Sequence, residues 1–430
     1  MKVRNVLVFP AGTEVGLEIY NALRGCKETR VFGAGQDVSN PGQMVFEKYH
    51  LVPNVFQAGW LQALVTLCKE LEIDYIYPAY DDVIVALQDV AEQLPCPVIA
   101  ASAHTCRIAR SKSQTYRALE GCVKVPRTFQ NPADVASFPV FVKPDRGQGS
   151  RGASRADNMA ELELACAAVR EPVISEFLPG DEFTVDCFSD RERGLLFAAA
   201  RRRIRMRNGI AVNSVSEDLP DIERMAAAIG DRLHMRGPWF FQIKRAENSE
   251  LTLLEVAPRI AGSMALNRVR GINFPLLGIY EHERMPLGLL TYDGPVEIDR
   301  ALANRYRHTL SYSVAYIDLD DTLILRGEVN LMVLALIFQC LNRRISVKLI
   351  TRHRFDVQAT LMQYRLAGVF DEVIHIVDGR PKSAFIKEAD AILVDDSFAE
   401  RRDVSEQCKI PTFDCSMIEM LLESPAAGVR

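Results

Sequence analysis

The sequence predicts an α/β multidomain protein. We expect a small N-terminal α/β domain, then an α+β domain, and finally a C-terminal domain with a Rossmann-like parallel sheet. Three observations predict this class. The chain has 430 residues, too many for one hydrophobic core. Short apolar runs alternate with helix-like stretches from residue 6 onward. Glycine-rich or acidic turns follow several of these runs, as they follow strands in α/β proteins.

Composition narrows the class of protein. The chain is 48% hydrophobic and 25% charged with a net charge of -5, so no nucleic-acid partner is expected. Its ten cysteines form no CxxC pair and no cluster of zinc spacing, which predicts reduced thiols and a cytoplasmic location. The N-terminus lacks the apolar core of a signal peptide, and no apolar run reaches transmembrane length. We therefore expect no membrane partner.

Residues 1–105 predict the first α/β domain. Gly12 and Gly16 follow its first strand and favour a tight turn into a helix with close packing. Asp81 and Asp82 stand just past the end of a second strand. The strands expected here are 6–9, 75–79 and 98–100.

The central segment carries a pattern suited to a nucleotide. Lys143 lies on a predicted strand, 138–144, and the turn 145–152 directly after it contains three glycines. Glycines let backbone amides approach phosphate oxygens, and a lysine neutralises their charge. The extended segment Glu176–Leu178 can read the edge of an adenine, and Glu182 can accept hydrogen bonds from ribose hydroxyls.

Two further strands supply oxygen ligands. Gln242 and Glu255 would face each other across a strand pair, and with ATP phosphates they can complete a magnesium shell. Arg259 adds a cation near the same place. A basic run, 201–207, lies between these motifs, and a solvated strand face and a position near phosphates explain it about equally well.

This constellation resembles the ATP-grasp superfamily, in particular the carboxylate–amine ligases similar to carbamoyl-phosphate synthetase. The resemblance covers roughly residues 1–300 and implies ATP and Mg²⁺ as cofactors. It implies that Gln242 and Glu255 bind magnesium and that Arg259 steadies the transferred phosphate. The segment 146–152 would be a lid over the triphosphate. The implied nucleotide-binding residues are Lys112, Lys143, Arg146, Gly147, Gly149, Ser150, Gly152, Glu176, Phe177, Leu178 and Glu182.

One position departs from the pattern of that superfamily. Its metal strand usually has the sequence Glu-x-Asn-Pro-Arg, whereas this chain has Glu255-Val256-Ala257-Pro258-Arg259. Ala257 offers no ligand atom, so the second magnesium loses a contact. A water, weaker metal binding or impaired catalysis are all compatible with this difference. The reaction implied is attack of a carboxylate on the γ-phosphate, followed by capture of the acyl phosphate by an amine.

A second site is predicted near the C-terminus. The apolar run 314–317 leads into Asp318 and Asp320, and Thr351 ends a later strand. Lys382 stands at a predicted helix start, and Asp395 and Asp396 end another strand. The ends of parallel strands meet at one edge of a sheet, so these groups should converge.

This second set resembles the haloacid-dehalogenase-like superfamily. The resemblance implies that Asp318 is the nucleophile and a magnesium ligand and that Asp320 is the general acid/base, with its carbonyl also on the metal. Thr351 and Lys382 would hold the phosphoryl group, and Asp395 with Asp396 would anchor magnesium. An acid at position 320 favours phosphatase chemistry. The gaps between the motifs leave no room for a cap domain.

The expected domains are therefore 1–105, an ATP-grasp domain at 106–300, a linker at 301–312 and a phosphatase domain at 313–430. The function expected is a bifunctional enzyme, a ligase joining small-molecule carboxylates and amines fused to a phosphatase acting on a phosphorylated small molecule. A homodimer stays open. Two alternatives also stay open: a phosphatase with an ATP-binding regulatory module, and a ligase with a non-catalytic, partner-binding C-terminal domain.

Overall fold

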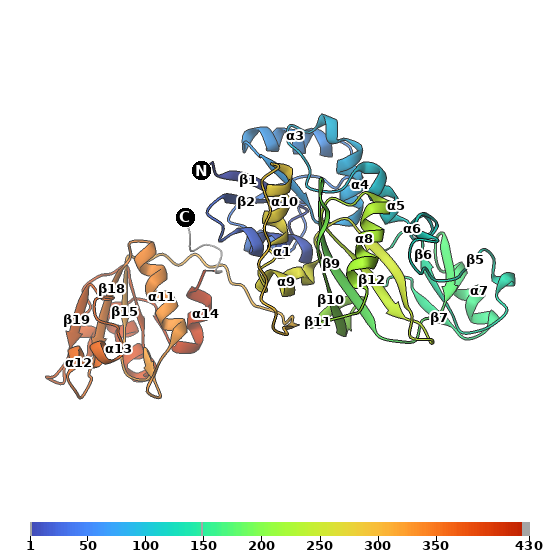
Figure 1. The fold of residues 1–430 in the computed structure, drawn as a ribbon. Helices are drawn as coiled ribbons and strands as arrows, with labels where there is room; N and C mark the ends of the chain where they lie inside the picture. The colour runs from blue at the N-terminus through green and yellow to red at the C-terminus, as the bar shows by residue number, and fades with distance from the viewer. Residues whose placement is uncertain (1, 148, 424–430) are drawn as a thin grey trace. The chain divides into compact units, whose positions relative to one another are not determined.

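A computed structural model describes residues 2–147 and 149–423 of the chain (Figure 1). Its internal contacts form two compact units, one spanning 1–302 and one spanning 303–430. All ten cysteines are free thiols. Within the described ranges, no helix is both long and apolar enough to cross a membrane.

The first unit opens with a four-stranded parallel sheet of order β3-β2-β1-β4. Val98, part of a predicted strand, forms only a single bridge to Ile76, because the chain turns away toward α5. The elements are β1 (Arg4–Phe9), α1 (Glu14–Leu23), β2 (Thr29–Gly35), α2 (Gly42–Val45), β3 (Tyr49–Leu51), α3 (Trp60–Glu70), β4 (Tyr75–Pro78), α4 (Asp81–Asp89), η1 (Ala91–Gln93), α5 (Ala103–Arg110) and α6 (Lys112–Leu119).

A small antiparallel sheet of order β5-β8-β6-β7 follows. Its core contains Val140, Val142 and Ile174, and Leu162 of α7 packs against them. This sheet carries Lys143 at the end of β6 and Glu176 at the end of β8. The elements are β5 (Thr128–Phe129), η2 (Pro132–Asp134), β6 (Val140–Pro144), β7 (Ser154–Ala156), α7 (Met159–Ala167) and β8 (Pro172–Glu176).

The largest sheet is six-stranded and antiparallel, with order β13-β12-β9-β10-β11-β14. The basic run recognised in the sequence lies at the end of its longest strand, β10. Its elements are β9 (Glu182–Asp190), β10 (Gly194–Arg207), β11 (Ile210–Glu217), α8 (Ile222–Leu233), β12 (Gly237–Arg245), β13 (Leu251–Ala257), η3 (Gly262–Met264), α9 (Ala265–Val269), α10 (Phe274–His282) and β14 (Glu297–Asp299).

The second unit contains a five-stranded parallel sheet of order β19-β18-β15-β20-β21. Ala315 and Ile317 of β15 join one buried cluster, whereas Val314 and Tyr316 join another on the opposite face. A sheet covered on both faces explains why its strands are continuously apolar. The elements are β15 (Val314–Ile317), β16 (Ile324–Leu325), β17 (Glu328–Val329), α11 (Leu331–Asn342), β18 (Ser346–Thr351), α12 (Val357–Gln363), β19 (Glu372–His375), η4 (Lys382–Ala384), β20 (Ala391–Val394), α13 (Phe398–Cys408), β21 (Thr412–Phe413), η5 (Cys415–Met417) and α14 (Ile418–Leu421).

Candidate functional site

Strand alternation gives the six-stranded sheet one apolar face and one polar face. On β9, Phe183, Val185 and Cys187 belong to the buried core that also contains residues of α8. The residues between them, Thr184 and Asp186, point to the opposite face. The polar face is therefore a consequence of period-two patterning, and it is the face on which the site is built.

Four of the polar-face residues lie in one row across four strands. Glu255 of β13 is in register with Gln242 of β12, Gln242 with Thr184 of β9, and Thr184 with Arg201 of β10. All four line a cavity of about 420 Å³. The facing pair predicted from the sequence, Gln242 and Glu255, is thus directly cross-strand.

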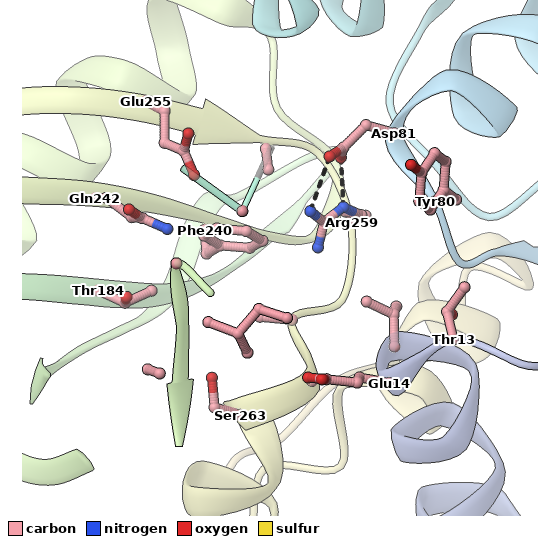
Figure 2. A pocket seen from close by; sticks show the side chains of 18 of the residues that line it. Thr13, Glu14, Tyr80, Asp81, Thr184, Phe240, Gln242, Glu255, Arg259 and Ser263 are labelled. Atoms are coloured by element: carbon pink, nitrogen blue, oxygen red, sulfur yellow. Dashed lines mark hydrogen bonds and ion pairs between the residues drawn. The ribbon is translucent and has the colours of Figure 1, made fainter. Parts of the chain in front are cut away.

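The first four-stranded subdomain closes the other side of this larger cavity. Figure 2 shows Thr13 and Glu14, at the start of α1, and Tyr80 and Asp81, at the start of α4, opposite the strand residues of the sheet. Thr13 caps α1 and also donates its hydroxyl to the carbonyl of Ala79, at 2.9 Å. The two helix starts are thereby tied together as one wall.

A smaller cavity of about 160 Å³ adjoins the larger one, and Lys112, Arg203, Gln242 and Glu255 line both. Most of the predicted nucleotide-binding residues meet here. They are Lys112, Lys143, Gly147, Gly149, Ser150, Glu176, Phe177, Leu178 and Glu182.

Lys143 is buried at the floor of the smaller cavity. Its Nζ donates to the hydroxyl oxygen of Tyr116 at 2.6 Å, and Tyr116 donates in turn to the carbonyl of Leu254 at 2.8 Å. Burial, assisted by the charge of Lys112, lowers the pKa of Lys143 to about 8. A cation that is this poorly solvated gains more from an anionic ligand than a surface lysine does.

Lys112 lies beside the same loop. Its Nζ approaches the carbonyl oxygens of Gly147 and Asp145 at 3.4 and 3.5 Å. Burial lowers the pKa of Lys112, and the nearby carboxylate of Glu255 opposes that shift. Lys112 therefore stands at the junction of the two cavities, and Lys143 lines the smaller one beside it.

The glycine-rich loop packs against the turn between β10 and β11. Gly209 has φ +73°, and a Cβ there would lie 2.3 Å from the carbonyl carbon of Gly149, so only glycine fits this close approach. Arg146 and Gly152, which were predicted to bind nucleotide, do not line either cavity among the described residues. Gln148, within the predicted lid, lies outside the described residues.

The predicted ribose ligand Glu182 has a partner within the protein. Its carboxylate pairs with Nη1 of Arg203, which also donates to Oε1 of Gln242 at 2.8 Å. Nη2 of Arg203 donates to the carbonyl of Gly209 at 2.7 Å. Arg203 therefore links the predicted ribose ligand, a predicted metal ligand and the hairpin turn, a role that the sequence analysis did not assign to it.

The metal-binding pair fits magnesium in part. Glu255 supplies a carboxylate and Gln242 an amide oxygen, both of which are hard ligands of the kind that magnesium takes. Ala257 is in register with Phe240 and lines the larger cavity. Its methyl side chain offers no oxygen, so β13 supplies no second side-chain ligand at this position. These residues would hold magnesium mainly together with oxygens of a bound phosphate.

Arg259 follows the metal strand and lines the larger cavity. Its guanidinium makes a two-point ion pair with Asp81, with Nε–Oδ1 at 2.5 Å and Nη2–Oδ2 at 3.0 Å (Figure 2). It also lies over the ring of Phe240, 5.1 Å from the centroid. The cation predicted to steady a phosphate is thus held from two sides.

The second unit has its own polar cluster at the carboxyl edge of the parallel sheet. Nζ of Lys382 donates to Asp318 at 2.5 Å and to Asp395 at 2.6 Å, and all three side chains are buried. Burial raises the pKa of Asp318 to about 7, with Asp395 adding to the shift and Lys382 opposing it. Burial also opposes the charge of Lys382, but the two carboxylates outweigh it and its pKa is raised.

This cluster fits a divalent cation. Asp318, Asp395 and Asp396 each place a carboxylate oxygen within 4.8 Å of the others. Three carboxylates stand against the single positive charge of Lys382, so a cation would meet a net negative charge here. Thr322 fixes the arrangement, because its hydroxyl oxygen accepts from the amide of Asp396 at 3.0 Å.

Asp320 and Thr351 lie beside this cluster rather than within it. The half-exposed Asp320 contacts Nδ1 of His353 at 2.8 Å, and Nε2 of His353 contacts the hydroxyl of Thr360 at 2.9 Å. The hydroxyl oxygen of Thr351 accepts from the amide of His353 at 3.1 Å. His353, which the sequence analysis did not select, thus connects the predicted acid/base to the predicted phosphoryl-binding strand.

Comparison with known proteins bears on the first unit. Residues 168–290 match the family described as "ATP-grasp in the biosynthetic pathway with Ter operon". A D-alanine--D-alanine ligase of Fusobacterium nucleatum is 28% identical over 74 residues, which is 17% of this chain. The match spans about a quarter, 26%, of the length of that ligase.

Several solved structures share the fold. The biotin carboxylase of Campylobacter jejuni in a β-γ-ATP complex has a TM-score of 0.59 at 13% identity and covers 69% of this chain and 75% of its own. The L-amino acid ligase of Bacillus licheniformis has a TM-score of 0.54 at 19% identity, covering 65% and 74%. The N5-carboxyaminoimidazole synthetase of Staphylococcus aureus with ADP has a TM-score of 0.57 at 14% identity, covering 68% and 81%.

These likenesses confirm the ATP-grasp part of the predicted fold. The family match ends at residue 290, so the haloacid-dehalogenase-like assignment of the second unit stays a prediction. Two residues of the first unit, Asp81 and Arg203, stood in motifs that the sequence shows, although no role was predicted for either. Asp81 stood at a strand end, and Arg203 stood in the basic run, but neither pattern names its partner.

Proposed function

We propose that residues 1–302 form an ATP-dependent carboxylate–amine ligase that uses Mg²⁺. The observation that carries the proposal is the pair of adjoining cavities, with the metal-binding pair and Lys112 at their junction. The smaller cavity suits a nucleoside, since it offers the extended segment Glu176–Leu178 and the ring of Phe177. The larger cavity suits the molecules that are joined.

In this proposal the triphosphate lies across the junction, between residues of the smaller and the larger cavity. Lys143 and Lys112 neutralise phosphate charge, and Gln242 with Glu255 would hold magnesium, which would supply further positive charge to the phosphates. The positive charge of Arg259 stabilises the negative charge that develops on the transferred phosphoryl group. A substrate carboxylate attacks the γ-phosphorus, ADP leaves, and an amine then attacks the acyl phosphate and releases inorganic phosphate.

Hydroxylamine makes this testable without knowledge of the natural amine, because it traps an acyl phosphate as a hydroxamate. The full chain with MgATP, pooled carboxylates and hydroxylamine should form ADP and hydroxamate together. Lys143→Ala should lower both by roughly a hundredfold to a thousandfold. Lys124→Ala is a matched control, because Lys124 is half-exposed and pairs only loosely with Glu250, at 3.7 Å. Unchanged MgADP affinity in Lys143→Ala contradicts the assignment.

A second candidate function belongs to residues 303–430. The buried cluster of Asp318, Lys382 and Asp395 supports a magnesium-dependent phosphatase in which Asp318 attacks a phosphate ester. Lys382 would stabilise the phosphoryl group, and Asp320, which His353 orients, would donate a proton to the leaving oxygen and then activate water. The substrate class proposed is a phosphorylated small molecule. Release of phosphate from a generic aryl phosphate with Mg²⁺ tests it.

A further inference from the structure

Arg201 is a charged side chain held rigidly in the middle of the largest sheet. It is 1% exposed, and Asp186, two residues along β9 from its register partner Thr184, accepts from its Nε and Nη2 at 2.9 and 3.0 Å. Nδ2 of Asn267 donates to the same carboxylate at 2.9 Å. Asp186 thus holds the guanidinium by two hydrogen bonds, and Asn267 holds Asp186.

One edge of this guanidinium is unused. Nη1 of Arg201 is buried and has no hydrogen-bond partner within the described residues. A buried donor without an acceptor is costly, and more so when it carries charge. Arg201 lines the larger cavity, so an occupant of that cavity can supply the missing acceptor.

The location of Arg201 separates it from the nucleotide. Arg203, two residues along the same face of β10, lines both cavities, whereas Arg201 lines only the larger one. Arg201 is in register with Thr184, which is in register with Gln242. Strands are about 4.8 Å apart, so the Cα atoms of Arg201 and Gln242 are separated by roughly 10 Å. That distance suits two groups of one small molecule better than a single carboxylate.

The charge of the larger cavity favours an anion. Seven lysine and arginine side chains among the described residues line it, against three lining carboxylates, Glu14, Asp81 and Glu255. Asp82, Asp186 and Glu182 pair with three of these arginines from outside the lining, which leaves an excess of one positive charge. The phosphates of a nucleotide would meet the cations at the junction. Arg201, farther along the row, remains for another acceptor.

We propose that Arg201 binds a second acidic group of the substrate, so that the acid used by this protein carries two anionic groups. One carboxylate lies beside Gln242 and Glu255 and reacts, and the other group, a carboxylate or a phosphate, accepts from Nη1 of Arg201. The assignment of the reacting end rests on the proposed ligase function. The anion site at Arg201 rests on its own contacts.

Three probes test this site in the full chain by calorimetry, with and without MgADP. Glutarate and 3-phosphonopropionate carry a second acidic group, and valerate is a monoacid of similar length. At least one of the two diacids should bind roughly tenfold or more tightly than valerate, the value of one charge-assisted hydrogen bond. Which diacid binds more tightly distinguishes a carboxylate from a phosphate. Equal binding of all three overturns the proposal.

The variants locate the preference. Arg201→Gln should remove the preference for the diacid, and Arg202→Gln should keep it, because Arg202 faces the other side of β10, is partly exposed and pairs with Glu217 at 2.8 Å. If Arg201→Gln does not fold, the double variant Asp186→Asn/Arg201→Gln removes both buried charges at once. A preference for the diacid that survives in Arg201→Gln or in the double variant contradicts the proposal. If the wild-type chain does not bind MgADP, the proposed ligase function is contradicted, whereas the comparison of the three acids still tests the site at Arg201.

Discussion

Asp81 and Arg259 form a two-point ion pair, with Nε–Oδ1 at 2.5 Å and Nη2–Oδ2 at 3.0 Å, between residues 178 positions apart in the sequence. Asp81 begins α4 of the first subdomain, and Arg259 follows the metal strand of the large sheet. The pair therefore joins the subdomain at the N-terminus to the proposed phosphate-binding cation. It gives that subdomain a direct part in orienting the site.

We predict that Asp81→Asn lowers both stability and ligase turnover. Arg259 would keep its charge without its partner, which should cost about 3 kcal/mol in urea denaturation at pH 7. A misplaced Arg259 should lower ATP turnover by roughly a hundredfold. Asp89→Asn, at the exposed end of the same helix, serves as the control and should change stability by less than about 0.5 kcal/mol.

The stability difference should also depend on pH. Burial would raise the pKa of Asp81, but Arg259 outweighs burial and the pKa is lowered. A depressed folded pKa gives stability that is present above the unfolded value, about 4, and lost as pH falls through the lower folded value. The difference between wild type and Asp81→Asn should therefore shrink below about pH 4. A constant difference down to pH 2 contradicts this assignment.

Nucleotide binding should weaken at moderately alkaline pH. Because burial lowers the pKa of Lys143 to about 8, the side chain loses its charge in a range where an ordinary lysine keeps it. Affinity for ADP without magnesium should fall by up to about tenfold per pH unit above pH 8. Titration calorimetry between pH 7 and 9.5 measures this. Lys143→Arg should flatten the profile, and a persistent slope would point to Lys112 instead.

Ala257→Asn should strengthen magnesium use in the ligase site. Gln242 and Glu255 supply one formal negative charge between them, so magnesium should bind poorly without nucleotide. The added amide oxygen should lower the magnesium concentration for half-maximal ATP turnover by about tenfold. Ala257→Leu adds similar volume without an oxygen and is the matched control. If both variants leave the magnesium dependence unchanged, another ligand already occupies that position.

If the wild type shows no ATP turnover and Ala257→Asn does, the result would have a different meaning. The natural ligase site would then be silent, and the alternative of a phosphatase with an ATP-binding regulatory module would be favoured.

Asp318→Asn should abolish hydrolysis of an aryl phosphate while MgADP binding persists. An amide is a poor nucleophile and a poor magnesium ligand, so activity should fall by a thousandfold or more. Release of p-nitrophenol measures it. Lys143→Ala provides the cross-control, since it should leave hydrolysis intact and impair only the nucleotide site. Wild-type hydrolysis in Asp318→Asn excludes this residue as the nucleophile.

The sequence alone determined the strands and the local motifs. Period-two alternation on β9 and the continuous apolar run of β15 identify which residues face a core and which face a site. The glycine-rich turn after Lys143 and the acids after β15 and β20 are local features, and their order along the chain was enough to predict ATP-grasp fold and both candidate sites. For β10 a solvated strand face was only one of two interpretations of the basic run 201–207, and β11, which contains no arginine, was not predicted at all.

Only the tertiary structure decided the partners. Arg203 joins Glu182 to Gln242, Asp81 holds Arg259, and His353 contacts Asp320. The contacts of Arg203 and His353 depend on which strands are neighbours and in which register, and these are set by burial across the whole sheet rather than by any local pattern. Asp81 and Arg259 follow strands of two different sheets and meet only because those sheets pack together. Strand register brings Arg201 into the row of Gln242 and Glu255, so its place in the larger cavity could not be predicted before the order of the strands was known.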